Sequence, residues 1–187
     1  GLQDIYLGGG KRQSGVLYLQ QSSGTWIQDA QSEFELHAES EETAALFFDA
    51  DGDQDLDLVT ASGGNEAKQG SRLHPILYLN HGGRFETAAN FPELETNASD
   101  IVAEDLDGDG DVDLVVGNGA FVAGLPGARP RVYLNGGTHH FRDSVLGWTK
   151  RITERLTADA SMQGPTECVS VRFGNVLGSN GSVLKAF

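Results

Sequence analysis

The chain has 187 residues, of which 39% are apolar and 25 are glycine, and its formal net charge is −14. The acidic excess argues against nucleic acid as a partner, because phosphate groups attract basic surfaces. The chain contains no apolar run of about 18 residues, so membrane insertion is not expected. The length fits one or two domains, and the single cysteine excludes an intramolecular disulfide.

The chain opens on GLQDIYLG, which matches the second half of an acidic loop that occurs twice more. The complete copies read DADGDQDLDLV from Asp49 and DLDGDGDVDLV from Asp105. Superposition places Asp4 on Asp57 and on Asp113, at periods of 53 and 56 residues. The chain is therefore expected to begin inside a third copy of the loop, as a fragment of a longer protein would.

A second pattern recurs in phase with the loops. A strand followed by glycine and then by an aromatic-led strand is typical of a β-hairpin. Three segments begin such a pattern: Leu17–Leu19, Leu77–Asn80 and Val132–Asn135. Further strands are expected before the complete loops, at Ala44–Phe48 and Ile101–Glu104, and after them, as at 56–61.

One repeat therefore has about four short strands, which at this period indicates a propeller or an array. Propeller blades are four-stranded sheets around a central channel. We predict a mainly β fold with about two and a half four-stranded blades of the β-propeller type. The longer links at 63–72 and 117–131 are rich in Gly, Asn and Pro and are expected to be surface loops.

The aspartates of both complete loops stand on alternate residues. Carboxylates so close together repel one another unless a cation lies among them, and Ca²⁺ accepts about six to eight oxygen ligands. Gly108 and Gly110 allow the turns with positive φ that fold such a loop around an ion. We therefore expect two Ca²⁺ sites. Their role is expected to be structural, because no base or nucleophile accompanies the aspartates.

The pattern DxDGDxxxDLxV with a later LYLNxGG and Phe resembles the FG-GAP/VCBS repeats, the calcium-loop blades of integrin α-subunits and of many bacterial surface and secreted proteins. The resemblance covers residues 1 to about 144. It implies side-chain ligands at the first, third, fifth and ninth loop positions and a main-chain carbonyl at the seventh. The ligands so implied are Asp49, Asp51, Asp53, Asp55 (carbonyl) and Asp57, and Asp105, Asp107, Asp109, Asp111 (carbonyl) and Asp113. Asp4 would be a ninth-position ligand.

The same motifs allow other interpretations. A solvated acidic loop without metal is the alternative to a calcium site. An EF-hand is excluded, because its loop ends in Glu between helices, whereas Thr60 and Val116 stand at that position here. Tyr18, Tyr78 and Tyr133 recur once per repeat and are expected to pack the blades, with carbohydrate stacking as the alternative.

The character of the chain changes near residue 147. Residues 1–147 hold 24 acidic and 8 basic residues, whereas residues 148–187 hold 3 and 5. A helix at Thr149–Ala160, a strand at Glu167–Val176 and the start of a helix at Ser182 are predicted. This order is typical of an α/β sheet. The predicted domains are therefore a repeat region at 1–146 and a short α/β fragment at 147–187.

The strings VLGWTKRITERL and VSVRFGNVLGSNGSV in this second part resemble nucleotide-sugar 4,6-dehydratases of the polysaccharide-biosynthesis type, which belong to the extended short-chain dehydrogenase/reductase family. Lys150 falls on the lysine of that family's catalytic Tyr-x-x-x-Lys pair, but Leu146 stands at the tyrosine position. Asn175 falls in a segment that lies beside the substrate in that family. The Gly-rich NAD fingerprint at a helix N-terminus is not found, so no catalytic or cofactor-binding residue is predicted.

These features predict a calcium-binding repeat module of an extracellular or envelope β-propeller, with an adhesive or other interaction role and no catalysis of its own. Its partner is expected to be a protein or a glycan, and open sheet edges allow edge-to-edge self-association. The alternatives are a fragment of an NAD-dependent nucleotide-sugar dehydratase or epimerase, or a non-functional chimera of the two families.

Overall fold

The computed structural model describes residues 2–64, 70–93, 95–118 and 130–143. The chain divides into two units, Gly1–Val145 and Leu146–Phe187, and the structure described below belongs to the first. The predicted helix–strand–helix fragment, with Lys150 and Asn175, lies outside the described residues. Within the described ranges, no helix is long and apolar enough to cross a membrane.

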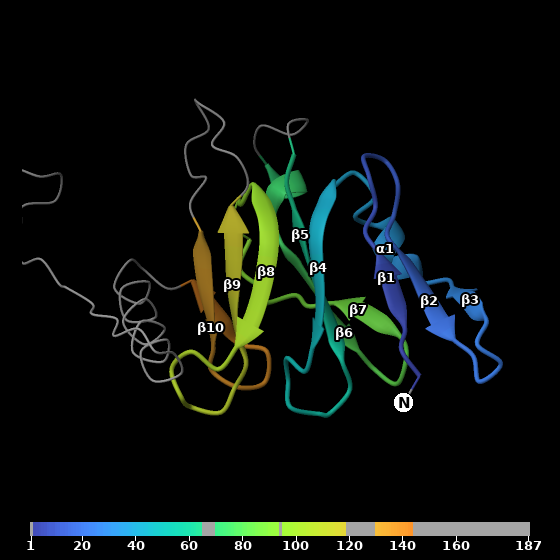
Figure 1. Ribbon diagram of the computed structural model, residues 1–187. Coiled ribbons are helices and arrows are strands. Elements are labelled where there is room, and N and C mark those ends of the chain that lie inside the picture. Colours follow the sequence, from blue (N-terminus) through green and yellow to red (C-terminus); the bar gives the residue numbers. More distant parts are fainter. Residues whose placement is uncertain (1, 65–69, 94, 119–129, 144–187) are drawn as a thin grey trace, which may run out of the picture. The chain divides into compact units, whose positions relative to one another are not determined.

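The described residues form three antiparallel sheets and almost no helix (Figure 1), which confirms the mainly β prediction. Each sheet is a meander, because its strands lie side by side in chain order. The strands are β1 (Ile5–Leu7), β2 (Val16–Gln20) and β3 (Trp26–Asp29) in the first sheet, β4 (Glu42–Phe48), β5 (Asp57–Ser62), β6 (Ile76–Asn80) and β7 (Phe85–Thr87) in the second, and β8 (Ala98–Glu104), β9 (Asp113–Asn118), β10 (Arg131–Asn135) and β11 (Phe141–Asp143) in the third. A short helix, α1 (Ser32–Glu35), and a 3₁₀ turn, η1 (Ser71–Leu73), complete the elements.

Strand pairing repeats in register from sheet to sheet. An apolar residue that follows the aligned aspartate pairs with the recurring tyrosine in each copy: Ile5 with Tyr18, Leu58 with Tyr78, and Leu114 with Tyr133. The repeat periods in the sequence are therefore also structural periods. By this alignment β1 corresponds to β5, and the described part of the first sheet contains no counterpart of β4.

The first strands of the two complete repeats begin earlier than their apolar patterns predict. β4 begins at Glu42 rather than at Ala44, and β8 begins at Ala98 rather than at Ile101. The register shifts between Glu42 and Ala44 and, at the equivalent place, between Ala98 and Asp100. In a β-bulge, two residues of one strand lie opposite one residue of its partner. The bulge interrupts the alternation of apolar and polar residues, so the residues before it do not match a strand pattern.

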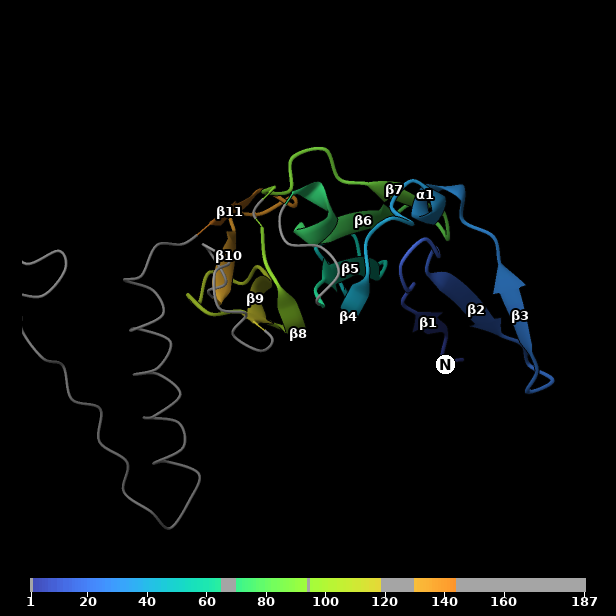
Figure 2. The same cartoon turned by 90° about the horizontal axis from the view of Figure 1, so that it is seen from above.

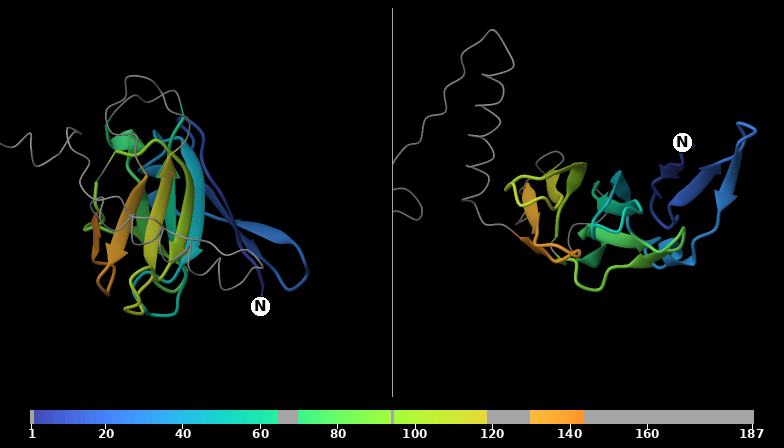
Figure 3. Two further views of the ribbon diagram at one scale, coloured as in Figure 1. Left: turned by 60° about the vertical axis from the view of Figure 1, so that its left-hand side comes forward. Right: turned by 90° about the horizontal axis from the view of Figure 1, so that it is seen from below.

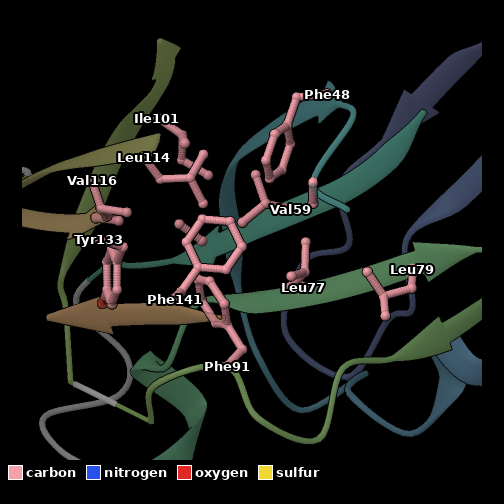
Figure 4. Close-up of a cluster of buried hydrophobic side chains, with 13 residues drawn as sticks. Phe48, Val59, Leu77, Leu79, Phe91, Ile101, Leu114, Val116, Tyr133 and Phe141 are labelled. Atoms are coloured by element: carbon pink, nitrogen blue, oxygen red, sulfur yellow. The ribbon is translucent and has the colours of Figure 1, made fainter. Parts of the chain in front are cut away.

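Consecutive sheets pack on one another through two apolar cores, and Figure 2 shows the three sheets following one another from above. The core between the first and second sheets contains Leu17, Phe34, Leu58, Ile76, Tyr78 and Phe85. The core between the second and third sheets includes Phe48, Val59, Leu77, Phe91, Leu114, Tyr133 and Phe141 (Figure 4). β5 is buried along its whole length because alternate residues serve the two cores.

The recurring tyrosines do not share one environment. Tyr78 and Tyr133 are fully buried in the two cores, which confirms the predicted packing role at these two positions. Tyr18 is half-buried and belongs to neither core. Ile5, Leu7 and Trp26, which lie on the same face of the first sheet as Tyr18, are exposed.

Helix α1 carries an aromatic residue into the first core. Phe34 is buried, and its ring centroid lies 5.0 Å from that of Tyr78 and 5.2 Å from that of Tyr6, edge to face in both pairs. In the second core the ring centroids of Phe91 and Tyr133 lie 5.3 Å apart, and these two rings are stacked. Helix α1 could not be predicted from the sequence, because four residues are too few to show a helical period.

Candidate metal centres

Both complete acidic loops connect the first and second strands of their sheets. Residues 49–56 join β4 to β5, and residues 105–112 join β8 to β9. The two loops lie at the same end of the sheets in Figure 1 and in the left view of Figure 3. Each loop begins and closes on a paired position, Phe48 with Asp57 and Glu104 with Asp113.

In each loop three aspartates lie close enough to share one cation. The groups are Asp49, Asp51 and Asp57 in the first loop and Asp105, Asp107 and Asp109 in the second, and one carboxylate oxygen from each member lies within 4.8 Å of those from the other two. Two oxygens that each lie about 2.3–2.6 Å from Ca²⁺ are at most about 5 Å apart. Both groups therefore fit an ion of this size, and carboxylates are the hard donors that it prefers.

Two predicted side-chain ligands lie outside these groups, Asp53 in the first loop and Asp113 in the second. Asp53 is the counterpart of Asp109, and Asp113 is the counterpart of Asp57, by the 56-residue period. The FG-GAP resemblance implies side-chain ligands at loop positions 1, 3, 5 and 9. The group of three aspartates contains positions 1, 3 and 9 in the first loop and positions 1, 3 and 5 in the second.

The seventh-position aspartates, expected to bind through their carbonyls, have side chains directed at the following hairpin turn. The main-chain N–H of Gly82 donates to Oδ2 of Asp55 over 3.3 Å. At the equivalent place, a Cβ atom added to Gly137 would lie 3.2 Å from Oδ2 of Asp111. These side-chain directions are compatible with the expectation that the seventh position would bind an ion through its main-chain carbonyl.

Main-chain hydrogen bonds to the first aspartate shape both loops. Asp49 accepts the N–H groups of Gly52 at 2.8 Å and Gln54 at 3.1 Å, and Asp105 accepts the equivalent groups at 2.7 and 3.2 Å. Gly52 and Gln54 have φ of 80° and 75°, and the two glycines at the equivalent positions have 83° and 97°. A carboxylate has about four acceptor sites, so these bonds leave lone pairs for an ion.

The ninth-position aspartates close the loops from the inside. Both carboxylates are fully buried, and both oxygens of each accept a main-chain N–H. The donors are Ala50 and Asn80 for Asp57, at 2.7 and 2.8 Å, and Leu106 and Asn135 for Asp113, at 2.9 and 2.7 Å. Each aspartate therefore ties its own loop to the end of the third strand of its sheet.

Burial raises the pKa of the Asp57 and Asp113 carboxyls, because the ionised form loses solvation. The two N–H donors act in the opposite direction, and aspartates of the same loop raise the pKa further. Desolvation raises the pKa of Asp107 as well, and the adjacent Asp109 adds to the shift. A cation among such groups favours their ionised forms, so an ion bound here would relieve the repulsion within each loop.

The first repeat keeps one of these contacts. Oδ1 of Asp4 accepts the main-chain N–H of Gln20 over 3.0 Å. Gln20 ends β2 as Asn80 ends β6, and Asp57 accepts the N–H of Asn80 in the same way. The contact supports the alignment of Asp4 with the ninth loop position.

The asparagines that end β6 and β10, Asn80 and Asn135, have a role that was not predicted from the sequence. Both donate their main-chain N–H to a ninth-position aspartate, and their side-chain amides bind carbonyls of the acidic loops. The signal that could have identified them is the recurrence of Asn directly after Tyr-Leu in both repeats with a complete loop.

Comparison with known proteins gives two separate matches. Residues 49–116 match the family model described as FG-GAP-like repeat, and residues 142–187 match the model described as polysaccharide biosynthesis protein. The probable polysaccharide biosynthesis protein EpsC of Bacillus subtilis (strain 168) is 48% identical over 44 residues of the C-terminal stretch. Both resemblances found in the sequence are confirmed, each over one segment of the chain.

The match to EpsC covers 24% of this chain and only 7% of the length of that protein. It therefore shows a shared segment rather than a shared activity. The FG-GAP-like match includes both complete acidic loops and the strands β5 to β8 between them.

Proposed function

We propose that the repeat region is a calcium-binding module of an extracellular or envelope β-propeller, with an adhesive or other interaction role toward a protein or a glycan. The observation that carries the proposal is a group of three aspartates in each of two equivalent loops, which are shaped by the same main-chain hydrogen bonds. The meander sheets, packed face to face, agree with propeller blades.

The proposed ion has a structural role. Its side-chain ligands come from the loop between the first two strands of a sheet and from the first residue of the second strand. An ion at this place holds the turn in its folded form and neutralises carboxylates that otherwise repel one another. Asp49, Asp51 and Asp57, with Asp53 and the carbonyl of Asp55, would hold the first ion, and their counterparts in the second loop would hold the second.

Calorimetric titration of the chelator-stripped chain with Ca²⁺ tests this proposal. We expect two bound ions and a melting temperature that rises with Ca²⁺, because a ligand that binds only the folded state stabilises it by mass action. Asp51→Asn and Asp107→Asn should each remove one site. Asp100→Asn, which changes an aspartate of β8 outside both groups, is the matched control and should keep both. Absence of binding heat, or a melting temperature that Ca²⁺ leaves unchanged, would contradict the proposal.

The match at 142–187 favours a second candidate, in which the C-terminal segment marks nucleotide-sugar chemistry of an NAD-dependent dehydratase or epimerase. NADH fluorescence distinguishes the two. Enhanced, blue-shifted emission in the presence of the chain would support this candidate. Unchanged emission would instead support a chimera in which the C-terminal segment carries no cofactor site.

A further inference from the structure

A continuous path of buried hydrogen bonds joins the two acidic loops. Oδ2 of Asp57 accepts the N–H of Ala50 over 2.7 Å, and the carbonyl of Ala50 accepts the side-chain amide of Asn135 over 2.9 Å. The main-chain N–H of Asn135 then donates to Oδ1 of Asp113 over 2.7 Å. All four residues are at most 3% exposed, so water does not compete for these bonds.

This path crosses from one sheet to the next. Ala50 lies between two members of the first carboxylate group, Asp49 and Asp51, in the loop of the second sheet. Asn135 is the last residue of β10 in the third sheet, 85 positions later in the chain. Asn135 therefore links the two loops, through its side-chain amide to the main chain of the first loop and through its main-chain N–H to the ninth-position aspartate of the second.

The equivalent asparagine of the second sheet does not form such a link. The side-chain amide of Asn80 donates to the carbonyl of Leu56, in the loop of its own sheet, over 3.0 Å. Its Oδ1 accepts the N–H of Gly83 in the adjacent hairpin turn over 2.7 Å. Among the described residues, the contact that joins the two complete loops is therefore made by Asn135.

We infer that Asn135 is a positioning residue that couples the two loops, so that an ion bound in one raises the Ca²⁺ affinity of the other. The inference rests on the proposed calcium binding. An ion in the first loop orders the main chain around Ala50, and Ala50 orders Asn135 and the Asp113 carboxylate that it contacts. The second loop then loses less conformational entropy when it binds, and the coupling is reciprocal by linkage.

Single-site variants measure this coupling by calorimetry. Asp107→Asn reports the first loop alone, and Asp51→Asn reports the second loop alone. In the unchanged chain we expect each loop to bind Ca²⁺ at least about fivefold more tightly when the other is filled. In a background of Asn135→Leu, which keeps the branched shape of the side chain but removes the donor, we expect this difference to shrink to about twofold or less.

Asn80→Leu is the matched control, because it removes the amide that contacts only its own loop. It should weaken the first site and leave the coupling in place. Independent binding of two ions by the unchanged chain, or full coupling in Asn135→Leu, would overturn the inference and leave calcium binding standing. If neither loop binds Ca²⁺, the inference and the proposed function both fail.

Hydrogen exchange supplies a readout that does not depend on how an Asn135 variant folds. In Asp107→Asn, only the first loop retains its full carboxylate group, so added Ca²⁺ acts there. We expect slower exchange of the Asn135 and Leu106 amides, which bind Asp113 in the other loop. Unchanged exchange of these two amides under saturating Ca²⁺ would contradict the coupling.

Discussion

At the scale of single residues, the two loops differ at one strained position. Gln54 has φ of 75° where its counterpart Gly110 has 97°. An L-residue with a side chain pays about 1–2 kcal/mol in this left-handed region, whereas glycine adopts it freely. The main-chain N–H of Gln54 still donates to Asp49, so the hydrogen bonding of the loop is kept at the expense of backbone strain.

Gln54→Gly should therefore stabilise the chain. Release of the strain is partly offset by the greater freedom of glycine in the unfolded chain, so we expect a net gain of about 0.5–1 kcal/mol in the free energy of unfolding. Urea denaturation in excess chelator and in excess Ca²⁺ measures the change. The gain should be present in both conditions, because the strain belongs to the loop backbone.

Gly110→Gln makes the reciprocal test in the second loop. A Cβ atom at Gly110 meets nothing within 4 Å, so its cost is conformational rather than steric. We expect a loss of about 1–2 kcal/mol. A Gln54→Gly variant that is less stable than the unchanged chain, or a Gly110→Gln variant of equal stability, would show that φ at this position is not strained.

At the scale of elements, the segment around α1 fastens the first sheet to the second. The side chain of Gln31 accepts the N–H of Phe85 at 3.2 Å and donates to the carbonyl of Gly83 at 2.8 Å. Glu33 accepts the N–H of Thr87 at 3.1 Å. The segment therefore lies along β7 and places Phe34 in the first core.

Phe34→Ala should weaken the packing between these two sheets. The ring of Phe34 contacts Tyr6, Tyr78 and Phe85, and truncation of a buried Phe to Ala typically costs about 3–5 kcal/mol. Leu36→Ala is the control, because Leu36 directly follows α1 and is 70% exposed. Its truncation should lower the free energy of unfolding by at most about 0.5 kcal/mol. Equal unfolding midpoints in urea for the two variants would argue against a role for Phe34 in holding the sheets.

At the scale of the whole molecule, buried and clustered carboxyls make stability depend on pH. The pKa values of Asp57, Asp107 and Asp113 are raised in the folded state. The folded state then binds these protons more tightly than the unfolded chain does. The protonated carboxyls therefore contribute to the free energy of unfolding at pH values below the unfolded pKa of about 3.9. This stabilising contribution is lost as pH rises through the raised pKa values of the folded state.

In excess chelator we therefore expect the melting temperature to fall as pH rises across this window. Saturating Ca²⁺ should remove the fall, because the ion favours the ionised carboxylates. The hydrogen bond from Thr87 lowers the pKa of Glu33. The ionised Glu33 carboxylate therefore stabilises the folded state, and this stabilisation increases with pH and partly offsets the fall. Glu33→Gln should consequently steepen the fall. A metal-free melting temperature that rises with pH would contradict the assignment.

The repeat, its hairpins and its acidic loops could be predicted from the sequence because their signals are local. Alternate aspartates, glycine turns and a Tyr-Leu strand lie within a few residues of one another, and their spacing repeats. The starts of β4 and β8 were predicted wrongly because a bulge interrupts the alternation of each strand. Helix α1 was missed because its four residues carry no period of their own.

The sequence by itself determined the loop chemistry, the mainly β class and the alignment of Asp4, Asp57 and Asp113. Only the tertiary structure decided which groups meet across sheets: that β5 is buried on both faces, that Asp57 and Asp113 lose all contact with water, and that Asn135 reaches Ala50 whereas Asn80 binds its own loop. The reason is physical. Residues 85 positions apart meet only after consecutive sheets have packed, and packing depends on the shapes of whole side-chain faces rather than on local spacing.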